Sequence, residues 1–246
     1  MYWHKKKLDY DILIPPINKQ FKNFTKKEAE SYFEWYKNQL NPRIEYLRKY
    51  SGVDLDYSVN SLVDIWGWFL KIAETEKAPK AKTEEVRNRL KSQPKEIIED
   101  VLNEQSRQFS LETEYIIRDI AMYFGEVYVK NNSSIAWGYH TDVKADSFAN
   151  MPLLVGFEDR DFTPAFKAHF EPLFMIHAVA CNIFDGDQTK EDLLLLYNKW
   201  QRMVHNWKCE IFRYNLIKIR WLTVTRCRSH GRTADSLPLY KTVTVW

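Results

Sequence analysis

A long apolar stripe at helical spacing is the feature that most constrains the fold of this 246-residue chain. It begins after Ser110, a residue type that caps helices, and ends at Asn131 and Asn132. Its members recur every three or four residues: Ile117, Ile120, Ala121, Phe124, Val127 and Tyr128. An apolar stripe of this length has to be covered by other elements. We therefore predict a long helix that begins at Ser110 and packs through this stripe.

More helices are predicted on the N-terminal side of this stripe. Thr25 and Glu28 have the spacing of a capping box and precede apolar residues at helical spacing. Asn41 followed by Pro42 is typical of a new helix start. We therefore expect one helix to end there and a second to run to about Tyr50.

The stretch after this second helix has further helix-start signals. Residues 74–82 are polar, which predicts a connector. Ser58, Thr83 and Pro94 are expected to begin helices on either side of it, with Ile97 on the buried side of the last one.

The pattern changes after residue 132. Residues 135–139 and 152–157 are short, apolar and bounded by turn residues, which predicts strands. Residues 164–184 are expected to be helical in part, with Pro172 interrupting or beginning an element. Thr189 is expected to cap a last helix.

These elements predict an α+β, helix-dominated fold in which N-terminal helices are followed by a long helix packed on a small sheet. We divide the chain into a helical part, residues 1–109, a mixed α+β part, residues 110–206, and a basic C-terminal segment, residues 207–246. That segment contains a strand-like run and favours Arg over Lys, unlike the rest of the chain. It is either a basic subdomain or a tail not matched to the rest, as a shifted reading frame would give.

Several functional classes lack their sequence signals. The chain has 7 glycines and neither common nucleotide-binding fingerprint, so we expect no cofactor. Cys181, Cys209 and Cys227 do not form a disulfide framework, and no metal-ligand spacing occurs, so we expect no metal. No run reaches about 18 uncharged apolar residues, so we expect no membrane partner and a cytoplasmic location.

Charge is unevenly distributed along the chain. The whole chain carries +3, with +5 over residues 1–50 and +6 over residues 207–246, so the residues between them carry −8. The basic ends are expected to be solvated surface, and we do not expect nucleic acid as a partner. The acidic middle predicts a basic protein partner. The 14 Tyr and 9 Trp favour this interpretation, because these residues dominate binding interfaces.

Asp119, Tyr123 and Glu126 form the first candidate catalytic cluster. On a helix they share one side, where two carboxylates beside a phenol can do acid–base work or hold a metal. Carboxylates on exposed helix faces are common, and perturbed ones are rare. We therefore expect a solvated helix face, with Glu126 on the solvent side.

His177 is the other candidate, because Cys181 follows it at a distance of four residues. A helix places both on one side, which is compatible with thiol chemistry or zinc. Their neighbours are apolar, so we expect this pair to serve core packing.

The run from Asp119 to Val127, followed by the strands at Trp137 and at 152–157, resembles a pattern in uncharacterised bacterial proteins. Some of these resemble the small immunity or accessory proteins that are encoded beside bacterial toxins. The resemblance covers residues 111–160. It implies a fold fragment and a partner-binding role, and it brings no catalytic residues with it.

Two functions follow from the sequence. Our first interpretation is a cytoplasmic bacterial protein-binding module of the immunity or accessory kind. The alternative is a hydrolase-type enzyme with a carboxylate and His site, built from Asp119, Glu126 or His177, in a cleft between the two parts. A pocket containing two of these side chains would favour the enzyme.

Overall fold

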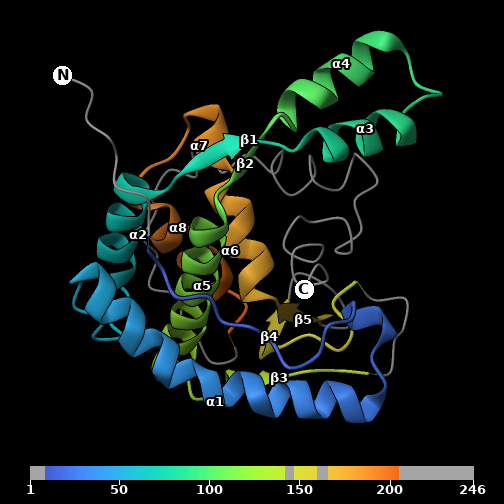
Figure 1. Cartoon of the computed structure of the whole chain (residues 1–246). Helices are drawn as coiled ribbons and strands as arrows, with labels where there is room; N and C mark the ends of the chain where they lie inside the picture. The colour runs from blue at the N-terminus through green and yellow to red at the C-terminus, as the bar shows by residue number, and fades with distance from the viewer. Residues whose placement is uncertain (1–8, 142–146, 160–165, 205–246) are drawn as a thin grey trace.

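The structure is a computed structural model that describes residues 9–141, 147–159 and 166–204. At its centre lies α5 (Leu111–Asn131), with other helices around it (Figure 1). The Ser110 hydroxyl accepts a hydrogen bond from the Thr113 amide at 3.3 Å, so the predicted cap is confirmed. Every member of the predicted stripe is at most 1% exposed. The C-terminal segment, residues 207–246, lies outside the described residues.

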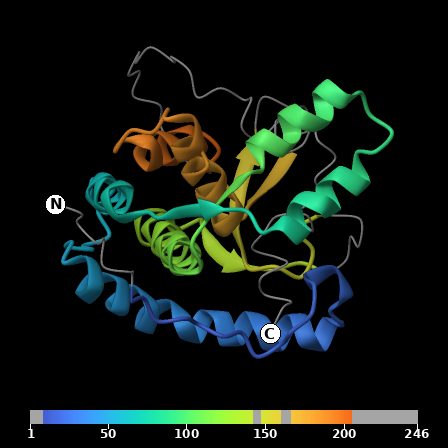
Figure 2. The ribbon, with the colours of Figure 1, turned by 45° about the horizontal axis from the view of Figure 1, so that its top comes forward.

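Helix α1 (Lys26–Ser51) packs against α5 across the face of the molecule (Figure 2). The capping box of Thr25 and Glu28 is present, and Gly52 ends the helix with a φ of 68°. The predicted break at Pro42 is wrong, because α1 continues through it. Apolar residues on both sides of the proline are buried, and their packing outweighs the cost of about 3 kcal/mol for an interior proline: Leu40, Ile44 and Leu47.

Four other helices complete the helical layer. They are α2 (Ser61–Ile72), α6 (Pro172–Ala180), α7 (Asn182–Asp185) and α8 (Asp192–Gln201), and a short 3₁₀ turn, η1 (Phe21–Asn23), precedes α1. Helix α6 packs on α5, and α8 packs on α2. Pro172 begins α6, where its missing N–H leaves no helical hydrogen bond unmade.

An antiparallel sheet with the order β3-β4-β5 lies beside these helices. Its strands are β3 (Ala136–Gly138), β4 (Leu153–Asp159) and β5 (Phe166–Phe170). The first two confirm the predicted strands, whereas β5 takes up part of the segment expected to be helical. The register shifts in the middle of β4. Gly156 lies there with a φ of 105°, and a Cβ on it would be 2.1 Å from the Ser134 carbonyl oxygen, so only glycine fits.

A helical hairpin projects from this body on a two-stranded ribbon (Figures 1 and 2). The ribbon pairs β1 (Thr75–Lys77) with β2 (Arg107–Phe109), and it leads to α3 (Lys80–Arg89) and α4 (Lys95–Glu104). We call the segment from Thr75 to Phe109 the arm. The predicted connector therefore contains a strand, and Ile97, expected to be buried, is 45% exposed. The reason is that the two arm helices pack mainly on each other, so that Val101 and Val86 are the only buried side chains among those described in these two helices.

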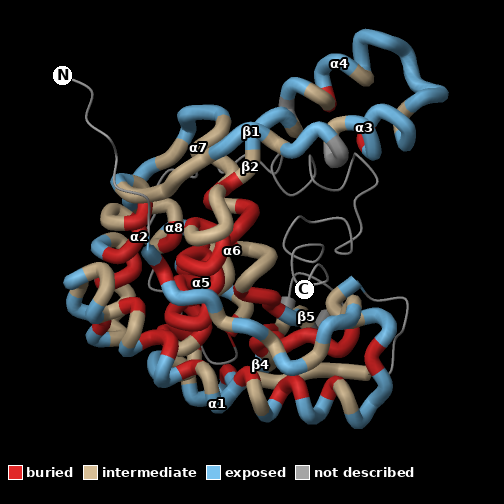
Figure 3. Tube along the Cα trace, viewed as in Figure 1, coloured by how far each residue is buried: buried red, intermediate tan, exposed pale blue. Residues whose placement is uncertain are grey.

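The largest of three hydrophobic clusters joins α2, α5 and the sheet (Figure 3). It includes residues from both sides of position 110, among them Trp66, Phe124 and Phe157. The predicted α+β, helix-dominated fold is confirmed. Among the described residues, no helix is both long and apolar enough to span a bilayer.

Candidate functional site

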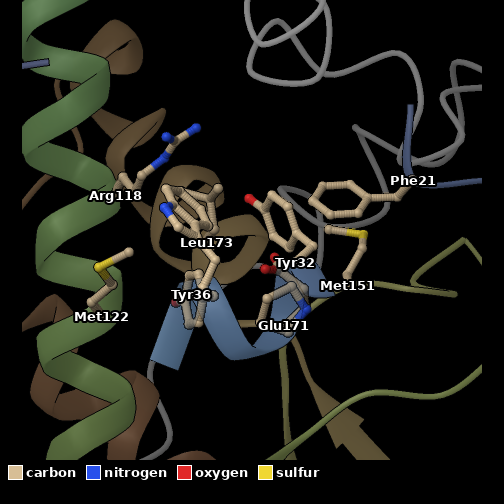
Figure 4. A pocket seen from close by; sticks show the side chains of 10 residues that line it. Phe21, Tyr32, Tyr36, Arg118, Met122, Met151, Glu171 and Leu173 are labelled. Carbon is tan, nitrogen blue, oxygen red and sulfur yellow. The ribbon is translucent and has the colours of Figure 1, made fainter. Parts of the chain in front are cut away.

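A small recess opens between the N-terminal half of α1, the middle of α5 and the start of α6 (Figure 4). Its free volume is about 30 Å³. Its lining combines aromatic rings, two thioethers and two charged side chains: Phe21, Tyr32, Trp35, Tyr36, Arg118, Met122, Met151, Pro152, Glu171 and Leu173. We call it the Glu171 recess, because this acidic residue dominates its electrostatics.

Aromatic rings form one wall of the recess. Tyr32, Trp35 and Tyr36 lie on α1 at positions i, i+3 and i+4, so they share one side of the helix that the capping box starts. The ring centroids of Tyr32 and Trp35 are 5.2 Å apart. Phe21 meets Tyr32 edge to face at 5.0 Å. The faces of such rings attract cations.

Glu171 brings a buried carboxyl group to the recess. It is the N-cap of α6, where its carboxylate accepts a hydrogen bond from the Phe174 amide, and its residue is 5% exposed. Burial raises the pKa of this carboxyl group to about 8, more than its backbone hydrogen bonds and Arg118 lower it. Burial thus favours the protonated form of this group.

Arg118 comes from α5, across the recess from the α1 side chains (Figure 4). Its Nη1 donates to the Leu13 carbonyl oxygen at 3.3 Å, and its guanidinium group lies 5.0 Å from the centre of the Tyr115 ring. Arg118 therefore interacts with the Leu13 carbonyl oxygen and the Tyr115 ring in addition to its effect on Glu171. Burial also raises the pKa of Tyr32, to about 12, so this phenol stays neutral.

The three predicted residues of α5 do not form one site. Asp119 is fully buried, so the expectation of a solvated face is wrong. Arg43 of α1 donates to it with Nη2 at 2.7 Å and with Nε, and the Tyr10 hydroxyl donates at 2.5 Å. This network ties the N-terminal segment and α1 to α5, and it occupies the carboxylate. The sequence pattern missed it because both partners are far away along the chain.

Tyr123 and Glu126 also have partners of their own. The Tyr123 hydroxyl lies 2.5 Å from the Ser61 hydroxyl and accepts from the Tyr57 amide at 3.0 Å. Glu126 is half-buried instead of solvated, and the Trp137 indole donates to it at 2.7 Å. α5 is surrounded on nearly all sides, so its polar residues are paired inside the fold rather than exposed.

His177 and Cys181 lie on one side of α6, as predicted, with Nδ1 and Sγ 3.7 Å apart. The structure adds Glu114 of α5, whose Oε2 is 3.4 Å from His177 Nε2. None of the four predicted candidates, Asp119, Tyr123, Glu126 and His177, lines the Glu171 recess.

A second, more open hollow lies where the arm joins the body. Its volume is about 530 Å³, and it is lined by Ala73, Glu74, Thr75, Glu76, Ser110, Leu111 and Glu112. Three of these seven residues are acidic and none is basic, so we call it the acidic hollow. It gives part of the predicted acidic middle of the chain a definite place on the surface.

Sequence reasoning missed the recess because its parts come from four distant segments. One local signal was present: Glu171 directly before Pro172 and an apolar run is the pattern of a capped helix start. Arg118 within the apolar stripe was a second signal, since a charge in a buried helix needs a special environment.

Within the described residues, no group of three His, Cys, Asp or Glu side chains is arranged to hold a metal ion. Comparisons of the chain with protein-family models, with curated proteins and with solved structures gave no match. The resemblance of residues 111–160 to immunity or accessory proteins therefore stays a prediction, and function has to be inferred from the site.

Proposed function

We propose that this chain is a protein-binding module that holds a basic partner by inserting one of the partner's lysine side chains into the Glu171 recess. The observation that carries the proposal is a buried carboxyl group beneath a wall of aromatic rings. Burial disfavours the anionic form of such a group, and an added cation favours it. A lysine ammonium supplies this charge and also contacts the ring faces.

The size of the recess selects the cation. One water needs roughly 10–15 Å³ of free volume measured in this way, so about 30 Å³ holds about two waters. A primary ammonium group is close to a water in size, whereas a guanidinium group is larger and planar. Lysine therefore fits the recess better than arginine does.

The surrounding charge also favours a basic partner. Residues 51–206 carry −8, and the acidic hollow places three glutamates together at the base of the arm. Complementary charge of this kind speeds encounter and excludes acidic partners. We place this activity in the bacterial cytoplasm, as an immunity or accessory function, on the basis of the resemblance of residues 111–160. The hydrolase alternative stays a prediction. None of its candidate residues lines the Glu171 recess or the acidic hollow.

The proposal is tested with a short, end-capped peptide that contains one lysine, observed by ligand-detected NMR. We expect binding to wild type and none by the same peptide with an acetylated lysine. Glu171→Gln keeps an oxygen that can cap α6 but removes the charge, and we expect about tenfold weaker binding. Because Glu171 loses its proton on binding, the wild-type affinity should be higher at pH 8.5 than at pH 6.5.

Glu34→Gln is the matched control, since it removes the same charge from the exposed side of α1. We expect it to bind like wild type. Equal losses of peptide affinity in both variants would mean that the peptide is held by general charge attraction and not by the Glu171 recess. Equal binding of the acetylated peptide, or preference for a peptide with glutamate in place of lysine, would assign the recess to another ligand and refute the proposal.

A further inference from the structure

Cys181 lies where α6 ends and α7 begins. Cys181 is partly exposed, and within the described residues its thiol is in no disulfide bond. His177 lies one turn earlier in α6, and its Nδ1 is 3.7 Å from the cysteine Sγ. A base beside a thiol at this position is the arrangement that produces a nucleophile.

The base is enclosed in the protein and has a carboxylate behind it. His177 is 5% exposed and Glu114 is 7% exposed. His177 Nε2 and Glu114 Oε2 are 3.4 Å apart, and neither atom has a hydrogen-bond partner among the described residues. The Phe109 ring contacts the His177 imidazole in a T-shaped arrangement, and the centroids of the two rings are 5.8 Å apart. The imidazole therefore faces the Glu114 carboxylate with Nε2 and the Cys181 thiol with Nδ1.

This setting favours a charged imidazole. Burial lowers the pKa of His177, but Cys181 and Glu114 raise it by more. The pKa therefore lies well above its ordinary value. His177 also lies in the last turn of α6, where the helix dipole favours a cation.

We propose that Cys181 is a modification site, at which the thiol reacts with hydroperoxides and other small electrophiles with the help of His177 and Glu114. Cys181 and His177 form a thiolate–imidazolium pair when the thiol proton passes to His177 Nδ1, and Glu114 stabilises the imidazolium through Nε2. The sulfur attacks one oxygen of a hydroperoxide, an S–O bond forms and the O–O bond breaks. The sulfur is oxidised to a sulfenic acid, and the departing oxygen takes the proton from His177 and leaves as an alcohol or water.

The backbone around Cys181 does not favour acyl transfer. The Cys181 amide donates to the His177 carbonyl oxygen at 3.0 Å, so it cannot stabilise the oxyanion of an acyl-transfer reaction. Cys181 lines neither the Glu171 recess nor the acidic hollow. The site therefore suits modification of the protein by a small electrophile, and it is independent of the proposed binding function.

The test measures alkylation of the full chain by iodoacetamide at pH 7, with the peptide that contains Cys181 quantified by mass spectrometry. The reference is the same cysteine in urea-unfolded protein. Activation should make the folded protein react about tenfold faster, because a free thiol is only a few per cent ionised at this pH. Hydrogen peroxide followed by dimedone should label Cys181, and Cys181→Ser should lose that label.

His177→Gln should bring the rate to the unfolded reference or below it, and Glu114→Gln should give an intermediate loss. Circular dichroism and thermal unfolding show whether each variant is folded. If His177→Gln does not fold, the alkylation rate of folded Glu114→Gln serves as the test. The proposal is overturned if Cys181 of folded wild type reacts more slowly than the reference. It is also overturned if the folded variants react as fast as wild type.

Discussion

Helix α5 and the arm show two opposite ways in which a helix is stabilised in this protein. Fifteen residues of α5 are buried, and its polar side chains are held by partners from α1, α2 and the sheet. The arm helices have few covered residues and expose Ile97. The comparison shows that the sequence of α5 is constrained by its neighbours, whereas most arm positions are constrained only by helix formation.

The largest contrast is expected from apolar truncation. Phe124→Ala removes a fully buried ring that stacks on Phe170 at 5.6 Å, so it should lower the free energy of unfolding by about 3–5 kcal/mol. Ile97→Ala in the arm should have little effect, because its side chain is already half in water. Urea unfolding measures both. Similar losses would mean that the arm is covered by a contact not seen in this chain alone.

A buried charge should show the next largest contrast. Asp119→Ala leaves Arg43, which is 4% exposed, with only the exposed carboxylate of Asp11, whose Oδ2 is 3.1 Å from its Nη1. Loss of the buried partner should cost up to about 3–5 kcal/mol. Asp100→Ala on the exposed side of α4 is the matched change and should not be measurable. The double variant Arg43→Met with Asp119→Leu should recover part of the loss. No recovery would show that the network contributes more than charge compensation.

Two glycines give a smaller and sharper test of packing around the helices. A Cβ at Gly125 of α5 would be 2.2 Å from the Trp137 ring, so Gly125→Ala should cost about 1–3 kcal/mol. A Cβ at Gly67 of α2 meets only the Lys190 Cβ, at 3.5 Å. Gly67→Ala should therefore stabilise the protein by about 0.5–1 kcal/mol through helix propensity. Thermal unfolding distinguishes the two signs, and a stabilising Gly125→Ala would place the Trp137 ring elsewhere.

The smallest effect is expected inside the arm. Val101 is 3% exposed and packs in the hairpin, so Val101→Ala should reduce protection of the arm amides from hydrogen exchange. The amides of α5 should keep their protection, because the arm meets the body mainly through its two-stranded ribbon. Loss of protection in α5 as well would mean that arm and body unfold as one unit.

The sequence predicted α5, the start of α1 and two of the strands, because their signals are local. A cap at Ser110 and a capping box at Thr25 act over three residues, and apolar spacing shows which side is buried. Pro42 misled the prediction, since the packing that keeps α1 continuous comes from another helix. Strand β1 was missed for a similar reason: its polar residues are extended only because β2, about 30 residues later, pairs with them.

The candidate site was harder to predict than the fold. The partners of Asp119 are Tyr10 and Arg43, and no spacing rule connects residues so far apart. In the sequence, the position of Glu171 before Pro172 indicates only an ordinary helix cap. Its chemical character comes from desolvation by α1, whose rings meet it only after folding. Local patterns thus identify elements, whereas the recess depends on how those elements assemble.

The most direct test of the account is an NMR titration of the Glu171 side-chain carboxyl carbon, assigned by comparison with Glu171→Gln. In the free protein we predict a pKa of about 8, well above the ordinary 4.5. Because the folded state favours the protonated group, stability relative to Glu171→Gln should fall as pH rises between these values. With the lysine peptide at saturation, the pKa should fall, because the lysine ammonium favours the carboxylate. A pKa near 4.5 in the free protein, or no change with the peptide, would contradict the account.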